Sequence, residues 1–343
     1  MKININKNIA ITEKSKPLII AEISGNHNGR LENVMKLIDL AKKSGADMVK
    51  IQTYEPADIT LNNNYVIKSG IWKNINLWKL YKKAQTPFSW HNEIFKYAKK
   101  KKVTLFSTPF SIRAVDFLES FNVPIYKISS FEITDLNLIK KIASTGKPII
   151  LSTGLSAISE IKRAVQTINK LHNKVIILHC VSGYPTPIKE ANIAMISKLK
   201  IIFPKNFIGL SDHTNSLESS FAAISLGAKI IEKHFKIKEN SKTPDSEFSL
   251  GPKKFKELVD GCANTWNSVF GNKKKLSELK SKKFRRSIFV KAKIKKGQKF
   301  SNKNIVNLRP KIGICSSNYF DILKKKSNKN IEAGKALKWT DVK

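Results

Sequence analysis

The stretch FIGLSDHTNS, residues 207–216, begins as an apolar strand and turns abruptly polar at Ser211, Asp212 and His213. The segment KIIEKHF (229–235) repeats this pattern and brings Glu232 and His234 behind an apolar pair. Six earlier apolar runs have a similar length and character: LIIAEI (18–23), MVKIQ (48–52), VTLFS (103–107), IYKIS (125–129), PIILS (148–152) and VIILH (175–179). Because these eight runs are rich in Ile and Val and lack alternation, they predict parallel strands that are buried on both faces.

Segments with helical periodicity separate the expected strands. They span residues 31–44, 90–101, 112–120, 135–145, 158–171, 190–203 and 216–226, and an eighth follows at 253–268. Eight β/α units over about 270 residues match the size of a (β/α)8 TIM barrel of the α/β class. A doubly wound open sheet is the alternative fold, but no GxGxxG motif follows the first strand.

The rest of the chain divides into three parts. Residues 1–16 precede the first strand and are expected to form a hairpin extension, so the barrel domain spans 17–270. Residues 271–284 are a charged linker or terminal helix, and residues 285–343 alternate short β-like pieces with Gly turns. A segment of about 60 residues is small for an independent core, so we expect this C-terminal domain to need a partner surface.

The composition restricts the partners that we expect. The net charge is +37, yet only six of the 63 basic residues are Arg, the residue favoured for planar recognition of phosphates and bases. Lysines are scattered through every expected helix, which indicates a compositional bias rather than a nucleic-acid-binding surface. A field of this sign would nevertheless attract an anionic substrate.

Membrane segments and cysteine frameworks are also not indicated. No apolar run approaches the about 20 residues that a membrane helix needs, and the first 17 residues contain no signal-peptide core. The three cysteines lie far apart and fit neither a disulfide framework nor a zinc finger. We therefore expect a cytoplasmic protein that binds neither nucleic acid nor membrane.

Polar residues follow or interrupt every expected strand, where a TIM barrel carries its chemistry. Lys50 and Lys127 lie inside apolar strands, where an unpaired ammonium group is costly, so we expect an anion between them. Hydroxyl groups from strands three to seven, among them Thr108, Ser130, Ser152, Ser182 and Ser211, can complete a cradle for a phosphate or carboxylate.

The two histidines at the ends of the last two strands suggest a metal site. Because His213 and His234 come from adjacent strands, their imidazoles can converge on one ion and leave coordination positions open for a substrate. Mn²⁺, Zn²⁺, Mg²⁺ and Co²⁺ are all compatible with two imidazoles. The alternative is two separately buried histidines, which is the interpretation that we give to His27, His91 and His172.

Several motifs together resemble the sialic-acid synthase family. They are AEISGNHNG (21–29), GADMVKIQTYEP (45–56), STPF (107–110), GKPIILSTG (146–154), HCVSGYPTP (179–187), IGLSDHT (208–214) and IEKHF (231–235). The stretch FRRSIFVKAKIKKGQKFSNKNIVNLRP (284–310) resembles the C-terminal antifreeze-like (SAF) domain of that family. Within the family, SGNHNG, FEITD and LWKLYKKAQTPFSW (77–90) are similar to pseudaminic acid synthases, and N-acetylneuraminate or legionaminate synthases are the alternatives.

The resemblance implies a transferase. Phosphoenolpyruvate would condense, in a metal-dependent reaction, with the open-chain aldehyde of 2,4-diacetamido-2,4,6-trideoxy-L-altrose. The products would be a nine-carbon 2-keto-3-deoxy sugar acid and phosphate, which leaves by cleavage of the C–O bond. The resemblance also implies a homodimer in which the small domain caps the barrel of the partner.

Residue roles follow from the same resemblance. Lys50, Lys127, Ser130, Ser152, Ser182 and Ser211 would hold phosphoenolpyruvate, and His213 and His234 would hold Mn²⁺, Mg²⁺ or Co²⁺ against the aldehyde. Glu22 would position a sugar hydroxyl or the attacking water. Gln52, Thr108, Glu132, Tyr184 and Asp245 would orient the sugar and the enol carbon, and Arg309 would reach the sugar from the small domain. Thr243 departs from the family pattern, which has Gly before the Pro-Asp pair.

Two other classes of protein remain open at this point. A Schiff-base aldolase could use Lys50 or Lys127, because a lysine within a barrel strand can form an imine. A lysine-rich binding protein without catalytic activity would tolerate the loss of His213 or Glu22.

Overall fold

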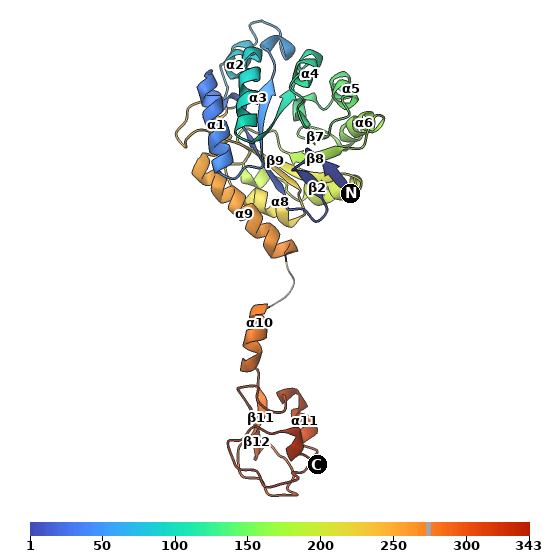
Figure 1. Cartoon of the computed structure of the whole chain (residues 1–343), viewed down its shortest axis with the longest axis vertical. Coiled ribbons are helices and arrows are strands. Elements are labelled where there is room, and N and C mark those ends of the chain that lie inside the picture. Colours follow the sequence, from blue (N-terminus) through green and yellow to red (C-terminus); the bar gives the residue numbers. More distant parts are fainter. Residues whose placement is uncertain (272–275) are drawn as a thin grey trace. The chain divides into compact units, whose positions relative to one another are not determined.

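The computed structural model describes residues 1–271 and 276–343. The chain folds into two units, Met1–Gly271 and Asn272–Lys343. The first unit is a closed barrel of eight parallel strands with helices around it (Figure 1). The strands are β3 (Leu18–Glu22), β4 (Met48–Thr53), β5 (Thr104–Pro109), β6 (Tyr126–Ile128), β7 (Ile149–Ser152), β8 (Val175–Cys180), β9 (Phe207–Asp212) and β10 (Ile230–His234). The predicted (β/α)8 barrel is therefore confirmed.

The helices of the barrel lie close to the predicted positions. They are α1 (Leu31–Lys43), α3 (His91–Lys100), α4 (Ile112–Glu119), α5 (Leu136–Ser144), α6 (Ile158–Asn169), α7 (Met195–Ile202), α8 (Glu218–Ser225) and α9 (Pro252–Phe270). One further helix, α2 (Leu77–Ala84), was not predicted and lies in the long connection between β4 and α3. Its N-terminus is capped by the Asn76 side chain, which accepts a hydrogen bond from the Lys79 backbone N–H at 3.0 Å.

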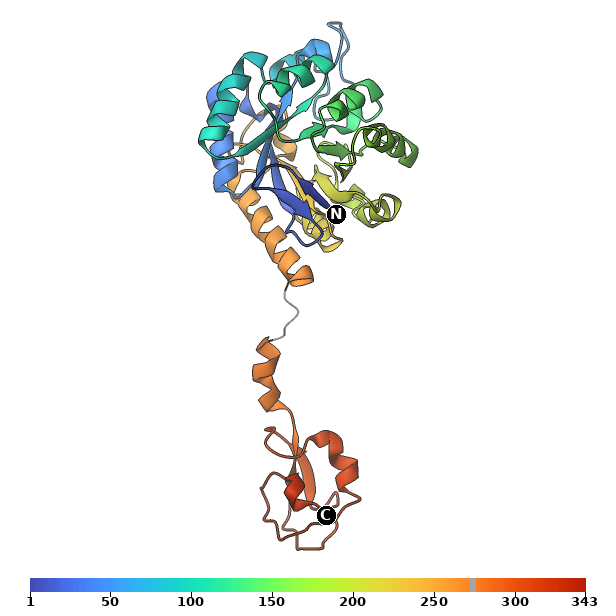
Figure 2. The same ribbon diagram turned by 45° about the vertical axis from the view of Figure 1, so that its right-hand side comes forward.

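Two apolar layers hold the barrel together. Outward-facing residues such as Ile19 and Val49 pack against the helices in one large buried cluster. Inward-facing residues near the start of the strands form a second cluster, made of Ile20, Met48, Phe106, Ile125, Ile150, Ile176, Leu178, Phe207 and Ile230 together with Ile3, Ile5 and Ile11. The last three belong to or adjoin the hairpin of β1 (Lys2–Asn4) and β2 (Ala10–Thr12), which therefore closes the N-terminal end of the barrel (Figure 2).

The second unit has an apolar core of its own. Its two strands, β11 (Ser287–Val290) and β12 (Ile305–Leu308), pair antiparallel, and α11 (Tyr319–Ile322) lies beyond them in the chain. The buried cluster consists of Ile288, Val290, Ile294, Phe300, Ile305, Ile314, Ile322, Ile331 and Leu337. Of the linker expected at 271–284, residues 272–275 lie outside the described residues, and α10 (Leu276–Ser281) follows them.

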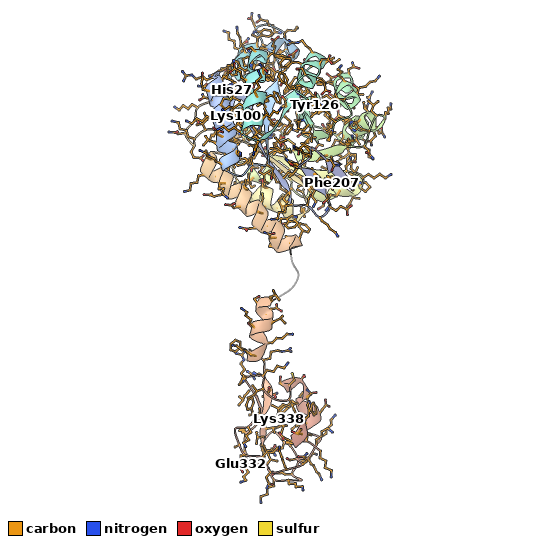
Figure 3. All side chains as sticks on the ribbon, viewed as in Figure 1. His27, Lys100, Tyr126, Phe207, Glu332 and Lys338 are labelled. Atoms are coloured by element: carbon orange, nitrogen blue, oxygen red, sulfur yellow. The ribbon has the colours of Figure 1, made fainter. Side chains whose placement is uncertain are left out.

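The lysine excess is a feature of the surface. Lysines such as Lys100 lie exposed on the helices of the barrel, with their side chains directed outward (Figure 3). In the described ranges, no helix combines the length and the apolar character that crossing a membrane requires. The cysteines Cys180, Cys262 and Cys315 are free.

Candidate active site

The inward-facing positions of the strands change from apolar to polar toward the C-terminal end of the barrel. Because side chains alternate along a strand, the position two residues beyond an inward apolar side chain also points inward. Two residues beyond the members of the inner cluster, the inward-facing residues are Glu22, Lys50, Thr108, Lys127, Ser152, Cys180 and Glu232. Ser211 on β9 and His234 on β10 continue the same alternation. A single alternation therefore produces both the core and the site.

These strand ends surround a pocket of about 600 Å³. Of the residues proposed from the sequence, it is lined by Lys50, Gln52, Lys127, Ser130, Glu132, Ser152, Tyr184, Ser211, His213, His234 and Asp245. Glu22 and Thr108 lie directly behind this lining, because both contact the Lys50 ammonium group. Ser182 and Arg309 are not among the lining residues, and Arg309 belongs to the unit 272–343.

The protein itself supplies a carboxylate between the two buried lysines. The Lys127 Nζ lies 3.0 Å from Glu232 Oε1, and the Lys50 Nζ lies 3.5 Å from the same oxygen. The Ser211 hydroxyl donates to this oxygen at 3.1 Å, and Lys50 also forms an ion pair with Glu22. An anion was predicted between the two lysines, but Glu232 was not predicted to be that anion. The one feature of the sequence that pointed to Glu232 was its position on β10.

Burial and charge determine the protonation of this group of four residues. Burial by itself would raise the pKa of Glu232, but Lys127 and Lys50 lower that pKa to about 2. Burial raises the pKa of Glu22 even though Lys50 acts in the opposite direction, and the nearby Glu232 charge raises it further. Burial lowers the pKa of Lys127, whereas the two carboxylates raise the pKa of Lys50 in spite of its burial. Glu232 is thus the permanent anion, and Glu22 is a stronger base than an exposed carboxylate.

Hydroxyl groups gather beside the lysines. The Ser130 hydroxyl accepts a hydrogen bond from the Gly154 N–H at 3.0 Å, and a Cβ at Gly154 would lie 2.1 Å from the Ser182 Oγ. Only glycine permits this approach, which brings Ser130 and Ser182 to the same loop. The buried Ser152 Oγ has no hydrogen-bond partner among the described residues. It is therefore a donor that a bound anion can engage.

The two histidine rings lie next to each other, with centroids 5.4 Å apart and an interplanar angle of 57°. The Nδ1 of His213 lies 2.9 Å from the Val181 carbonyl oxygen, to which it can only donate, and this leaves the Nε2 lone pair free. The Nδ1 of His234 lies 3.1 Å from the Ser24 hydroxyl, which can accept a hydrogen bond from it, and in that tautomer the Nε2 of His234 also carries a lone pair. Burial, together with the charges of Lys50 and Lys127, holds the pKa of His234 well below its usual value. The His234 ring is thus neutral, as a metal ligand must be. Burial alone would lower the pKa of His213 as well, but the contacts with Cys180 and the Val181 carbonyl raise it.

This arrangement fits a divalent cation. A ring nitrogen binds a metal at about 2 Å, so two rings at this separation can share one ion. Within the described part of the chain, no group of three or more His, Cys, Asp or Glu side chains could hold a metal. A metal ion held here would have two nitrogen ligands from the described residues, and its other positions would be left to water or substrate oxygens.

The remaining predicted residues surround the histidines. The Tyr184 ring lies 4.5 Å from the His213 ring, centroid to centroid. The Asp245 carboxylate accepts a hydrogen bond from the Gly25 N–H at 3.0 Å, and Glu132 accepts one from the Ser129 hydroxyl. The apolar part of the lining was not predicted from the sequence; it includes Ile67, Trp72, Leu77, Leu80 and Phe248.

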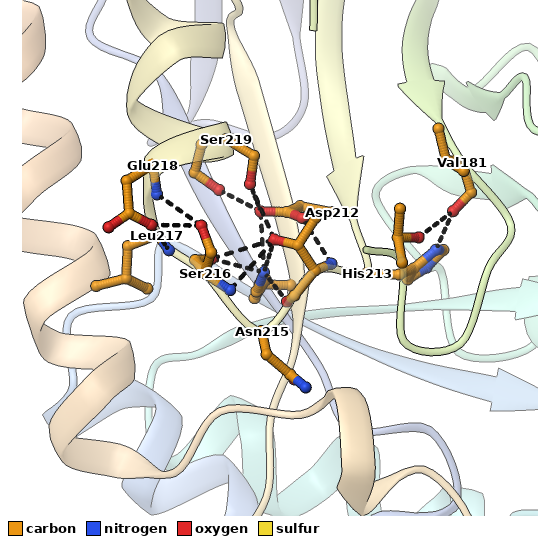
Figure 4. A network of polar contacts seen from close by, with 12 residues as sticks. Val181, Asp212, His213, Asn215, Ser216, Leu217, Glu218 and Ser219 are labelled. Carbon is orange, nitrogen blue, oxygen red and sulfur yellow. Dashed lines mark hydrogen bonds and ion pairs between the residues drawn. The ribbon is translucent and has the colours of Figure 1, made fainter. Parts of the chain in front are cut away.

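Asp212 and Lys233 do not face the pocket, although they immediately precede the two histidines. They form an ion pair of 2.9 Å on the outer side of the barrel, where Asp212 also accepts hydrogen bonds from the hydroxyls of Ser219 and Ser220 (Figure 4). The alternation that turns His234 inward turns Lys233 outward. This ion pair therefore stabilises the packing of the outer face of the barrel and does not bind a ligand.

Known proteins of similar sequence include two sugar-acid synthases. A pseudaminic acid synthase from Campylobacter jejuni is 40% identical over 332 residues, which covers 95% of this chain and 96% of that protein. An N,N'-diacetyllegionaminic acid synthase, also from Campylobacter jejuni, is 36% identical over 333 residues, or 94% of this chain and 99% of that one.

Solved structures show the same architecture. A crystal structure of N-acetylneuraminic acid (sialic acid) synthetase from Leptospira borgpetersenii, in complex with citrate, has a TM-score of 0.74 at 31% identity and covers 82% of this chain and 95% of that chain. The profile of the NeuB family matches residues 37–275. The chain therefore belongs to the NeuB family.

Proposed function

We propose that the chain is a pseudaminic acid synthase. It condenses phosphoenolpyruvate with the open-chain aldehyde of 2,4-diacetamido-2,4,6-trideoxy-L-altrose and releases phosphate and a nine-carbon 2-keto-3-deoxy acid. The observation that carries this proposal is that two buried lysines and two adjacent histidines line one pocket. The Campylobacter jejuni relative, which aligns along 95% of the chain, supports the choice of sugar.

The lysine side of the pocket would hold phosphoenolpyruvate. Lys50 and Lys127 carry the charges that a phosphate and a carboxylate need, and Ser130, Ser152, Ser182 and Ser211 supply hydroxyl donors. The free Ser152 hydroxyl supports this assignment most directly. Glu232 keeps the two ammonium groups in place while the pocket is empty, and it would share them with the substrate when the anion binds.

The histidine side would hold the sugar. Mn²⁺, Mg²⁺ or Co²⁺ bound by His213 and His234 would act as a Lewis acid that polarises the aldehyde. Gln52, Thr108, Glu132, Tyr184 and Asp245 would orient the sugar and the enol carbon. Of these, Tyr184 lies against the His213 ring and Asp245 is fixed by the Gly25 backbone.

The chemistry needs one base. The C3 carbon of phosphoenolpyruvate would attack the aldehyde carbon, whose oxygen becomes an alkoxide, and a positive charge would remain at C2. Water would add at C2 and give one proton to Glu22, whose raised pKa suits that role, and this proton would pass to the alkoxide to form the new hydroxyl group. The resulting tetrahedral carbon would then expel phosphate by breaking its C–O bond, its hydroxyl proton would leave with the phosphate, and the ketone would form.

The small unit would complete the site in a homodimer. Residues 284–310 resemble an antifreeze-like domain, and we propose that this domain caps the barrel of the partner and presents Arg309 to the sugar. The relatives align over nearly the whole chain, so they include this unit. We expect the reaction to occur in the cytoplasm, where phosphoenolpyruvate is available.

Release of phosphate from phosphoenolpyruvate tests the proposal. Release should require both the sugar and a divalent cation, stop with EDTA and resume with Mn²⁺. N-acetylmannosamine and the di-N-acetylated precursor of legionaminic acid are the comparison sugars, because the 36% identical relative makes the latter a specific alternative. If no acylamino sugar elicits phosphate, the proposal fails.

A Schiff-base aldolase is a second candidate, because Lys127 is a buried lysine on a barrel strand and burial lowers its pKa. Borohydride in the presence of pyruvate would trap an imine on such an enzyme. We expect no adduct, since Glu232 accepts the Lys127 ammonium group at 3.0 Å.

A further inference from the structure

The segment between β10 and α9 brings two residues to the histidine side of the pocket. Asp245 and Phe248 both line the pocket, and the centroid of the Phe248 ring lies 4.7 Å from that of the His234 ring. Residues 243–249, which carry both side chains, are here called the 243–249 loop. Its first residue, Thr243, departs from the family pattern, which has Gly at this position, and does not line the pocket. The contacts of this extra side chain therefore indicate a role outside the pocket lining.

The Thr243 hydroxyl contacts the buried side chain of Asn26. The Asn26 Nδ2 donates to the Phe235 carbonyl oxygen at 2.9 Å, and because a carbonyl oxygen can only accept, this contact fixes the orientation of the amide. Its Oδ1 is thus the atom that faces Thr243, and the Thr243 hydroxyl is the donor. The Asn26 Nδ2 also donates to the Ser249 hydroxyl at 2.8 Å. One buried amide therefore joins both ends of the 243–249 loop to the turn after β3.

The turn after β3 also holds Asp245, which lies between the two ends of the loop. The Asp245 carboxylate accepts a hydrogen bond from the Gly25 N–H at 3.0 Å. The Asp245 carbonyl oxygen accepts one from the Ser249 hydroxyl at 2.5 Å, and this hydroxyl is the one that accepts from Asn26. Thr243 and Ser249 thus connect the backbone on either side of Asp245 to the same Asn26 side chain, so the position of Asp245 depends on that side chain.

We infer that Thr243 is a positioning residue, which acts through Asn26 to hold Asp245 in place before the sugar binds. This inference rests on the proposed function, in which Asp245 orients the sugar, and it adds a residue that lies outside the pocket lining. A carboxylate that is already held in the empty site loses less conformational freedom when a ligand binds, so the Thr243 hydroxyl should strengthen sugar binding. Phosphoenolpyruvate, which we assign to the lysine side of the pocket, should bind independently of Thr243.

Thr243→Val tests the inference, because valine has the shape of threonine but lacks the hydroxyl. The variant leaves the Asn26 Oδ1 without this donor, whereas the hydrogen bond from the Thr243 N–H to the Ser246 hydroxyl at 3.1 Å remains. The assay is Mn²⁺-dependent phosphate release with 2,4-diacetamido-2,4,6-trideoxy-L-altrose. We expect KM for the sugar to rise about 10-fold and kcat to change less than about 2-fold, as when binding is lost equally in the ground and transition states. Thr243→Ser restores a hydroxyl and should restore KM, and the Kd for phosphoenolpyruvate should be the same in both variants.

Two further variants show whether the effect passes through Asp245. Thr145→Val is the matched control, because Thr145 is half-buried like Thr243, donates its hydroxyl to the Ile142 carbonyl oxygen at 2.7 Å and does not line the pocket. It should leave KM and kcat unchanged. In a protein that carries Asp245→Asn, adding Thr243→Val should raise KM by less than about 2-fold, because the two residues act in one unit and their effects do not add. The melting temperature of each variant shows that it is folded.

Proteolysis gives a readout that does not depend on the proposed function. Lys242 is exposed and immediately precedes Thr243, so trypsin can cleave the bond between them when the 243–249 loop opens. When cleavage is slow, its rate follows the population of the open form. We expect Thr243→Val to increase the rate of cleavage at this bond about 10-fold, measured by mass spectrometry of the new termini. Thr243→Ser and Thr145→Val should leave that rate unchanged.

The outcomes separate the inference from the proposed function. If the unmodified protein releases no phosphate with any acylamino sugar, the proposed function fails and the role in sugar binding fails with it, whereas the cleavage rates still decide whether Thr243 holds the loop. Unchanged cleavage in Thr243→Val would overturn the inference even if the enzyme is active. Faster cleavage with an unchanged KM, or a full additional rise of KM in the Asp245→Asn background, would show that Thr243 does not act by positioning Asp245. A lower melting temperature and a lower kcat with an unchanged KM would indicate a purely structural role and would also overturn it.

Discussion

The Asp212 carboxylate and the Lys233 ammonium group lie 2.9 Å apart on the outer face of the barrel, and each belongs to the residue before a pocket histidine. The two residues are direct partners in the β9–β10 register. The Lys233 Nζ also donates to the carbonyl oxygens of Thr214 at 2.5 Å and Ser216 at 3.2 Å, so it holds the loop that follows His213. The ion pair thereby links β9 to β10 immediately before the two histidines, on the face of the strands opposite the pocket, and so positions the two imidazoles.

We predict that breaking this pair weakens metal binding without touching the metal site. Lys233→Met leaves Asp212 buried without its partner, which should cost about 3–5 kcal/mol of unfolding free energy. The affinity for Mn²⁺ should fall by about 10- to 100-fold, as for other residues that orient metal ligands. Calorimetric titration with Mn²⁺ measures the affinity, and thermal unfolding measures the stability.

Two further variants make this test specific. Asp212→Asn keeps an acceptor for Ser219 and Ser220 and should have a smaller effect than Lys233→Met. Lys141→Met removes the surface ion pair with Asp116, which is worth at most about 1 kcal/mol, and should leave Mn²⁺ binding unchanged. A folded Lys233→Met protein with the original Mn²⁺ affinity would refute the positioning role.

His213 and His179, which lie on the neighbouring strands β9 and β8, should differ sharply in their effect on Mn²⁺ binding and on kcat/KM. His213→Ala removes one of two nitrogen ligands, so Mn²⁺ binding should be lost at micromolar concentrations and kcat/KM should fall by about 10³-fold or more. His179 is buried on β8, but its Nε2 contacts the Ala191 carbonyl oxygen at 2.8 Å and it does not line the pocket. His179→Gln is therefore the control and should retain Mn²⁺ binding. Equal losses in both variants would indicate general damage to the barrel instead of a ligand role.

Much of the barrel could be predicted from the sequence, because short runs of Ile and Val bounded by polar residues have few alternative structures. The polar residues at the ends of the expected strands, such as His213 and His234, also indicated where the site lies. The counter-ion role of Glu232 could not be predicted, because it depends on β10 closing the barrel opposite Lys127. The α2 helix was missed because LWKLYKKA carries a helical pattern in a segment that no strand–helix count requires.

Acid should destabilise the barrel through a histidine outside the pocket. His91 is fully buried, and burial lowers its pKa from the ordinary 6.5 to about 4 although the carbonyls of Pro87 and Phe88 act in the opposite direction. Between these two values the unfolded chain binds a proton that the folded chain does not, so stability falls as the pH falls from 6.5 to 4. One such group accounts for about 3 kcal/mol over this range.

The slope of unfolding free energy against pH tests this prediction. His91→Gln should lower stability at pH 7.5, since the Thr53 hydroxyl contact is altered, yet it should flatten the decline below pH 6.5 by about 1.4 kcal/mol per pH unit. The half-buried His172 is the comparison, and His172→Gln should change the slope less. Parallel curves for the original protein and His91→Gln would show that His91 is not the titrating group.

Mixing two inactive variants can reveal whether the small unit completes the partner's site. Glu22→Ala disables the barrel and Arg309→Ala disables the proposed cap. If caps act across a homodimer, a mixed dimer contains one site with both defects and one site with neither. Random exchange should therefore restore about a quarter of the original activity, because half of the dimers are mixed and each has one intact site.

If each cap served its own barrel, or the chain were monomeric, the mixture would stay inactive. A mixture of Glu22→Ala with the Glu22→Ala/Arg309→Ala double variant contains no intact barrel and should remain inactive in either case, which makes it the control for contamination and reversion.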